Sequence, residues 1–136
     1  AGGKSKSPSL YTKLKDKLNI PVILLFDNDA KEICSLLDKN LLNKDKSIII
    51  QEGEFEDILS KNLIKRALNN EYEIATPLLI SDLSISNRMC ENIQLFYRTR
   101  HLGEYKKSKV SKIIANNIKY KTDITQEVRD ILCQIL

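Results

Sequence analysis

Apolar residues in the first part of the chain are spaced first as in a helix and then as in a strand. Ser7-Pro8-Ser9 has the cap and first-turn chemistry of a helix start, and leucines then recur at helical intervals, which predicts a helix over residues 9 to 18. Residues 20 to 26 form an unbroken apolar run with β-branched side chains. Such a run predicts a central parallel strand that is buried on both faces.

Helical spacing returns over residues 30 to 42, with Asp29 as the expected N-cap. A second β-branched run at residues 47 to 51 predicts another strand. The order strand, helix, strand indicates a right-handed crossover within a parallel sheet. We therefore expect an α/β fold with a parallel sheet flanked by helices.

The second half of the sequence is expected to be mainly helical. Its predicted helical segments cover residues 55–59, 63–68 with Ser60 as a cap, 86–100, 108–120 and 124–136. We expect residues 1–75 to form a partial α/β core and residues 76–136 a helical extension that packs on the same domain.

Length and composition favour a soluble, cytoplasmic protein without a membrane partner. The chain has 136 residues, 42% of them hydrophobic and 29% charged, and no apolar run long enough to cross a bilayer. The three cysteines, Cys34, Cys90 and Cys133, lie far apart among apolar residues, so buried reduced thiols are expected. The net charge of +4 leaves room for a local acidic site, and the lysine clusters at 4–17, 39–46 and 106–121 are each typical of solvated surface.

Two acidic turns follow the two predicted strands. Asp27 and Asp29 come directly after the first strand, and Glu54 and Glu56 lie in the group that follows the second. Because ligands of open α/β sheets bind outside the carboxyl ends of the strands, we expect these carboxylates to converge. Their hard oxygen atoms suit Mg²⁺ or Mn²⁺. The alternative is that they only cap helices and form a solvated first turn.

At these residues the chain resembles a known family. The stretch from Pro21 to Asp29 looks like the Asp-x-Asp strand of Toprim domains, which occur in topoisomerases, primases and overcoming-lysogenization-defect (OLD) nucleases. Ala1 to Lys6 resembles the glycine-containing turn before the preceding helix, and Gly53 to Leu59 resembles the turn that contributes a metal-binding glutamate in OLD-type nucleases. Gly2-Gly3-Lys4-Ser5 is interpreted as a turn, because it lacks the spacing of a phosphate-binding loop.

The resemblance implies a set of site residues. Asp27, Asp29 and Glu56 would be catalytic and would bind the metal together with Glu54, while Asp57 is a less certain member. Lys109 to Ala115 is similar to a late lysine-bearing helix, so Lys112, or else Lys109, would stabilise charge in the transition state. The match covers residues 1–68 and, loosely, 106–136.

The family further implies a metal-dependent DNA endonuclease. DNA would be the substrate, an ATPase domain of the same parent protein would be a partner, and homo-oligomerisation stays open. Toprim domains carry another glutamate on an earlier strand, upstream of the glycine turn, which this sequence does not contain. The chain is therefore expected to be a fragment of a larger ATPase-nuclease, and the fragment alone is not necessarily active.

Two other function classes are compatible with the sequence. In a non-catalytic binding module, the apolar tail would dock a partner; its members are Ile113, Ile114, Ile118, Ile124, Val128, Ile131 and Leu132. A receiver-like phosphoacceptor domain would need an acidic pair at its first strand and a separate aspartate at a later strand, an order that this sequence does not supply.

Overall fold

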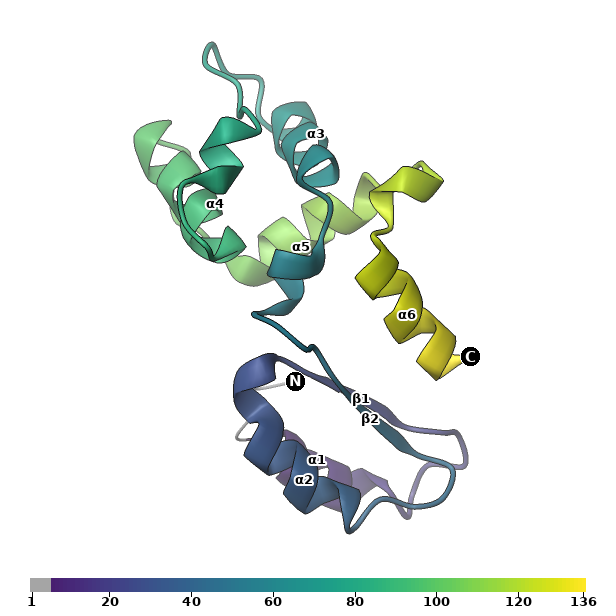
Figure 1. Ribbon diagram of the computed structural model, residues 1–136. Helices are drawn as coiled ribbons and strands as arrows, with labels where there is room; N and C mark the ends of the chain where they lie inside the picture. The colour runs from purple at the N-terminus through teal and green to yellow at the C-terminus, as the bar shows by residue number, and fades with distance from the viewer. Residues whose placement is uncertain (1–5) are drawn as a thin grey trace. The chain divides into compact units, whose positions relative to one another are not determined.

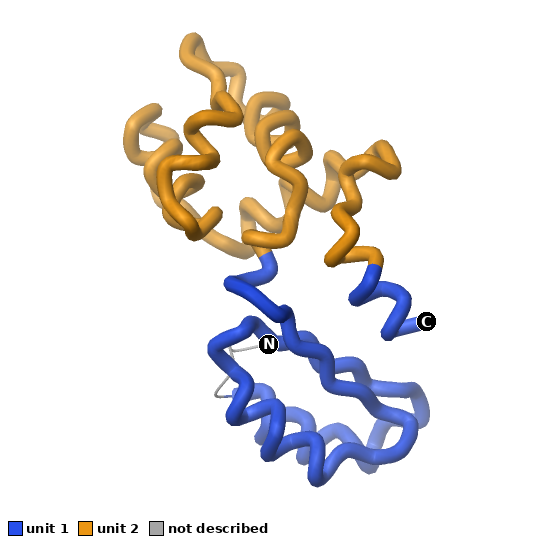
Figure 2. Tube along the Cα trace, in the orientation of Figure 1, with its two compact units in different colours: residues 1–55, 130–136 blue, residues 56–129 orange. Residues whose placement is uncertain are grey.

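The computed structural model describes residues 6 to 136, so the expected turn at Gly2-Gly3-Lys4-Ser5 lies outside the described residues. Two units are distinguished in Figure 2: residues 1–55 together with 130–136, and residues 56–129. The boundary between them thus follows Phe55, whereas the sequence suggested a division after residue 75. Each unit is described in turn.

The first unit contains a parallel β-α-β arrangement. Helix α1 (Ser7–Leu14) precedes strand β1 (Ile23–Phe26), and helix α2 (Lys31–Asp38) connects it to strand β2 (Lys46–Ile49), as Figure 1 shows. Within residues 6 to 136 the sheet has these two strands, and they pair in parallel. The expected mixed α/β fold with a parallel sheet flanked by helices is confirmed at this level.

Helices α1 and α2 cover one face of the small sheet. Their buried side chains pack against Phe26 in a cluster that consists of Tyr11, Phe26, Ala30, Cys34 and Leu37. Leu25 points to the opposite face, because side chains alternate along a strand, and it is 41% exposed. The prediction that this strand is buried on both faces is therefore wrong at Leu25, and in a sheet of two described strands it is not central.

A buried polar contact fixes α1 to the loops around the sheet. The hydroxyl of Tyr11 donates to Asp45 Oδ2 at 2.7 Å and accepts the Leu42 N–H at 3.0 Å. Asp45 Oδ1 accepts the Val22 N–H at 2.9 Å, and this bond is the main cause that lowers the pKa of Asp45. Burial, followed by the bond to Asp45, raises the pKa of Tyr11. Both polar side chains are thus paired inside the unit, as buried groups require.

The second unit is helical, in agreement with the sequence. Its elements are α3 (Lys61–Glu71), a 3-10 helix at Ser81–Ser84, α4 (Met89–Thr99), α5 (Lys107–Asn116) and a 3-10 helix at Lys121–Asp123, preceded by a 3-10 helix at Phe55–Ile58 and followed by α6 (Gln126–Ile135). Helix α6 begins in the second unit and ends in the first. The Ser60 side chain accepts the Leu63 N–H at 3.3 Å, so the predicted cap of α3 is confirmed.

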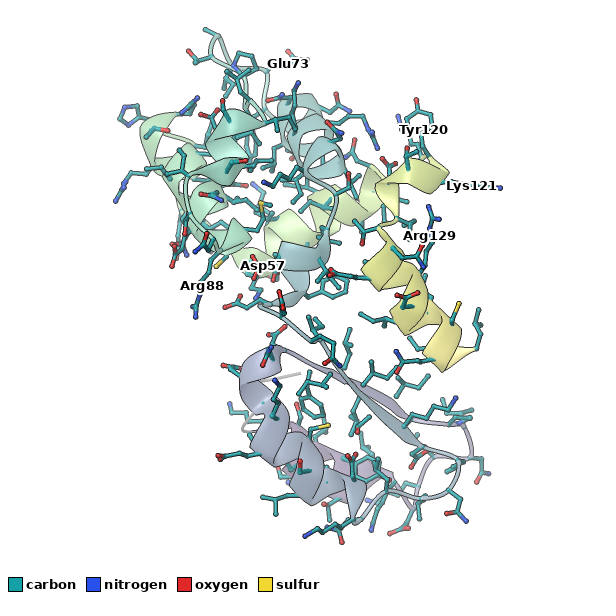
Figure 3. The ribbon with its side chains drawn as sticks, in the orientation of Figure 1. Asp57, Glu73, Arg88, Tyr120, Lys121 and Arg129 are labelled. Carbon is teal, nitrogen blue, oxygen red and sulfur yellow. The ribbon has the colours of Figure 1, made fainter. Side chains whose placement is uncertain are left out.

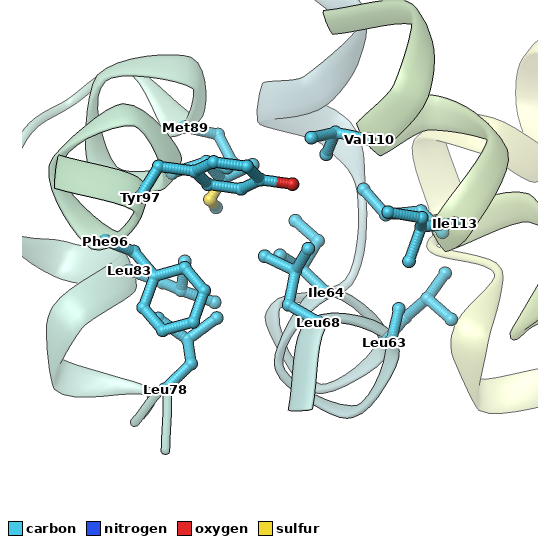
Figure 4. Packing of buried hydrophobic residues seen from close by; sticks show 13 residues of the cluster. Leu63, Ile64, Leu68, Leu78, Leu83, Met89, Phe96, Tyr97, Val110 and Ile113 are labelled. Carbon is cyan, nitrogen blue, oxygen red and sulfur yellow. The ribbon is translucent and has the colours of Figure 1, made fainter. Parts of the chain in front are cut away.

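Apolar side chains from α3, α4 and α5 form the core of the second unit (Figure 4). The completely or almost completely buried members include Leu63, Ile64, Leu68, Leu78, Leu83, Ile93, Phe96, Tyr97 and Val110. The Tyr97 ring meets those of Tyr72 and Tyr105 edge to face, and its hydroxyl lies 2.7 Å from that of Tyr72. Burial raises the pKa of Tyr97, which keeps the phenol neutral.

An ion pair connects α3 with the segment that follows α5. Arg66 Nη2 lies 2.6 Å from Asp123 Oδ2 and also donates to the carbonyl of Asn117 at 2.8 Å. The same Asp123 oxygen accepts the backbone N–H groups of Lys119 and Tyr120. The hydrogen bond from Arg66, followed by these backbone donors, lowers the pKa of Asp123 to about 2.

Two local predictions are corrected by the structure. Asp29 is not the N-cap of α2, because residues Asn28–Ala30 form a 3-10 turn and Ala30 occupies the cap position. Cys34 is buried as expected, but Cys90 is half-buried and Cys133 is exposed. No helix within residues 6 to 136 combines the length and apolar character needed to cross a membrane.

Candidate functional site

The two acidic turns of the first unit leave the sheet at the same edge. Phe26 and Ile49 are partners in the parallel register, and the Ile50 N–H donates to the Phe26 carbonyl at 2.9 Å. Both strands end at this level, and the chain continues into Asp27 on one side and toward Gly53 on the other. The edge is the one at which open α/β sheets bind their ligands.

Hydrogen bonds join the two turns directly. Asp27 Oδ1 accepts the backbone N–H of Phe55 at 3.0 Å, and the Asn28 N–H donates to the Gly53 carbonyl at 3.1 Å. The Asn28 side-chain amide also donates to the Gln51 carbonyl. Gly53 has φ of 72°, a left-handed conformation that glycine adopts without the steric cost of a Cβ atom. The turn after β2 is therefore held against the turn after β1.

The remaining predicted acids of the first unit differ in exposure. Asp27 and Glu54 are half-buried, whereas Asp29 is exposed within its 3-10 turn. Asp27 precedes that turn, yet its side chain makes no capping hydrogen bond there and reaches across to Phe55 instead. At Asp27, therefore, the geometry does not show a helix-capping side chain.

Glu56 lies in the second unit, in the 3-10 helix that precedes α3. Its side chain is only 6% exposed, and Lys107 Nζ lies 3.0 Å from its Oε2 atom. This contact is an ion pair without hydrogen-bond alignment, and within the described residues Oε2 receives no hydrogen bond. A buried carboxylate oxygen with unused acceptor capacity is costly to keep, and such atoms are commonly completed by a cation or water.

The lysine at Glu56 is not one of the two that the sequence singled out. Lys112 is exposed on α5, and Lys109 Nζ lies 5.6 Å from the centre of the Tyr72 ring. Lys107, the first residue of α5, makes the contact. No local pattern singles out Lys107, because the predicted helix begins one residue later and Lys107 is one of several lysines in its cluster.

Asp57 stabilises the start of α4 in the second unit. Its Oδ1 atom accepts the Met89 N–H at 2.6 Å, at the first residue of α4. The aspartate thereby satisfies one of the N–H groups that every helix start leaves without an intrahelical partner. Figure 3 labels Asp57 together with Arg88, the residue before α4.

The predicted site residues are thus divided between the two units. Asp27, Asp29 and Glu54 belong to the first unit, and Glu56 and Lys112 to the second. Within residues 6 to 136, no three His, Cys, Asp or Glu side chains already form a group that could hold a metal ion. The three acids of the first unit offer hard oxygen donors, which fit Mg²⁺ or Mn²⁺ in chemical type.

Comparison with models of known families, with curated proteins and with solved structures gives no match for this chain.

Proposed function

We propose that this chain is a Toprim-like part of an OLD-type, metal-dependent DNA endonuclease and works beside an ATPase domain of the same parent protein. The observation that carries the proposal is the hydrogen-bonded pair of acidic turns at the carboxyl ends of β1 and β2. These turns keep Asp27, Asp29 and Glu54 at the sheet edge where such a site is expected. The same residues carry the resemblance to the Asp-x-Asp strand of Toprim domains.

Asp27, Asp29 and Glu54, which all belong to the first unit, would hold the Mg²⁺ or Mn²⁺ ion. When bound, such an ion orients water and offsets negative charge on the scissile phosphate. Asp27 is pre-positioned for this task because the Phe55 N–H fixes one of its oxygens. Glu56, which the resemblance adds to the site, lies in the second unit, where its buried Oε2 atom is 3.0 Å from the Lys107 ammonium.

Lys107 would act on the position and charge of Glu56. Its ammonium lies 3.0 Å from Glu56 Oε2, while its side chain remains 48% exposed. A half-exposed lysine of this kind can hold the carboxylate and also donate to a phosphate oxygen, since an ammonium needs no fixed fork geometry. We therefore add Lys107 to Lys112 and Lys109 as candidates for the lysine of the site.

Nicking of supercoiled plasmid DNA with and without Mg²⁺ tests this function. We expect Mg²⁺-dependent nicking that Asp27→Asn reduces at least about 100-fold, because the amide still accepts the Phe55 N–H but removes a ligand charge. Asp16→Asn, which removes an exposed acid beyond α1, is the control and should nick like the wild type. Equal rates for wild type and Asp27→Asn would contradict the proposed catalytic role.

A non-catalytic binding module is the second candidate. It is favoured by exposed apolar side chains near the C-terminus: Ile118 is 46% exposed and Leu132 is 44% exposed. Apolar side chains of this kind are common at protein interfaces, although single ones are ordinary on any surface. Association with a partner that needs no metal and survives Asp27→Asn would favour this function over the nuclease.

A further inference from the structure

An exposed tyrosine lies in the second unit, on the connection between α5 and α6. Tyr120 is 59% exposed and directly precedes the 3-10 helix Lys121–Asp123. Figure 3 shows the side chains of Tyr120 and Lys121 projecting outward from this connection. The other tyrosines of the chain are buried or half-buried. Tyr120 is thus the tyrosine whose ring is most accessible to a ligand.

The tyrosine is held in place although it is exposed. Arg66 lies over the Tyr120 ring, 5.1 Å from its centre, and is itself fixed by its ion pair with Asp123. The Tyr120 N–H donates to Asp123 Oδ2 at 2.9 Å, and the Tyr120 carbonyl accepts the Asp123 N–H at 3.0 Å. Because Arg66 covers one face of a ring that is largely exposed, the other face is open to solvent. A planar group can stack on that face at little cost in entropy, since backbone and ring are already fixed.

Cationic residues flank the tyrosine in the chain. Lys119 and Lys121 are its direct neighbours, both are exposed, and within residues 6 to 136 their ammonium groups make no hydrogen bond or ion pair. Arg129 Nη2 donates to the Lys121 carbonyl at 3.0 Å, which orients the guanidinium and leaves its other N–H groups available. The surface around Tyr120 thus offers two free ammonium groups and one oriented guanidinium.

Acidic residues are scarce around the tyrosine. The sequence contains none from residue 105 to residue 122. Asp123 is buried and paired with Arg66, and the next exposed acids, Glu127 and Asp130, lie on α6. The charges of the first unit balance, so the formal charge of +4 lies entirely in the second unit. This environment favours an anionic ligand.

We propose that this surface, formed by Tyr120 with Lys119, Lys121 and Arg129, binds single-stranded DNA. An unpaired base stacks on the open face of the Tyr120 ring, and the cations contact phosphates of the same strand. An unpaired strand fits better than a duplex, because the bases of a duplex stack on one another and leave no face for the ring. The choice of DNA as the polyanion rests on the proposed nuclease function, whereas the surface itself needs no metal ion.

Binding of a short fluorescent oligothymidylate, measured in EDTA, tests the role of the ring. Tyr120→Ala should weaken binding roughly 5- to 100-fold, the loss expected for one base stacked on an aromatic side chain. Tyr120→Phe keeps the ring and should bind like the wild type. Binding of a duplex of the same length should change little in Tyr120→Ala. Thermal unfolding of both variants establishes that they are folded.

The salt dependence of the same binding tests the cations. Between about 50 and 200 mM salt, we expect Lys121→Ala to lower the slope of log K against log[salt] by about 0.7, the value for one phosphate contact on a single strand. Lys39→Ala is the control, because it removes an exposed lysine of the first unit, and it should leave the slope unchanged.

These measurements separate the surface from the nuclease function. If Tyr120→Ala weakens oligothymidylate binding but the wild type does not nick plasmid DNA, the surface stands and the nuclease proposal fails. The surface is overturned if the wild type binds no oligothymidylate, if Tyr120→Ala binds it like the wild type, or if Lys121→Ala and Lys39→Ala change the salt slope equally. Tighter binding of an oligouridylate RNA of the same length would overturn the choice of DNA.

Discussion

Among the buried carboxylates of the described chain, Glu56 has the least complete environment. Asp45 accepts bonds from Tyr11 and a backbone N–H, and Asp123 accepts from Arg66 and two backbone N–H groups. Glu56 Oε2 instead faces the single ammonium of Lys107 and receives no aligned hydrogen bond within the described residues. The first two acids are satisfied structural groups, whereas Glu56 Oε2 depends on one ion pair.

Removal of Lys107 should therefore be costly for stability. Lys107→Ala would leave Glu56 buried without its ammonium, and we expect a loss of roughly 1–3 kcal/mol in the free energy of unfolding, measured with urea. Lys112→Ala, on the exposed side of the same helix, should change it by less than about 0.5 kcal/mol. Adding Glu56→Gln to Lys107→Ala should recover part of the loss. Equal effects of the two lysine substitutions would show that the ion pair is not important.

At the scale of elements, the Arg66–Asp123 pair joins α3 to the connection between α5 and α6. Arg66 also lies 5.1 Å from the centre of the Tyr120 ring, so the guanidinium is held from two sides. The backbone N–H groups that bond to Asp123 come from this connection, at Lys119 and Tyr120. One carboxylate thus fixes the end of a helix and the turn that follows it.

The depressed pKa of Asp123 predicts how this contact depends on pH. Its folded pKa of about 2 lies below the usual value of 3.8, so its stabilising effect is complete above about pH 4 and is lost as pH falls toward 2. We expect the difference in unfolding free energy between wild type and Asp123→Asn to shrink over this interval. Urea unfolding at several pH values measures it. A difference that stays constant from pH 5 to about pH 2 would contradict the assigned cause.

The elements themselves were largely predictable, because each has a local pattern. The two β-branched runs and the helical spacing between them predicted the parallel β-α-β unit. Ser60 predicted the start of α3. The burial predicted for β1 was too high. The exposure of Leu25 depends on which elements pack on the other face of the sheet, and the apolar run of the sequence does not reveal this. The Glu56–Lys107 contact joins positions that are distant in sequence, so no local pattern could indicate it.

At the scale of the whole molecule, the acidic residues of the candidate site form a local group within a chain of positive net charge. The formal net charge is +4, yet two short turns of the first unit bring Asp27, Asp29 and Glu54 to one sheet edge. A positive surface favours association with a polyanion such as DNA, while a local carboxylate group favours a divalent cation. The proposed function therefore requires that this one sheet edge binds a metal ion.

Titration calorimetry of the chain with Mn²⁺ tests that capacity most directly. We expect saturable binding to the wild type and to Asp16→Asn, and no measurable heat of binding for the double variant Asp27→Asn/Asp29→Asn, because two of its ligand charges are gone. Thermal unfolding without metal should be similar for all three proteins, so that loss of binding is not loss of fold. Unchanged Mn²⁺ affinity in the double variant would contradict the central claim.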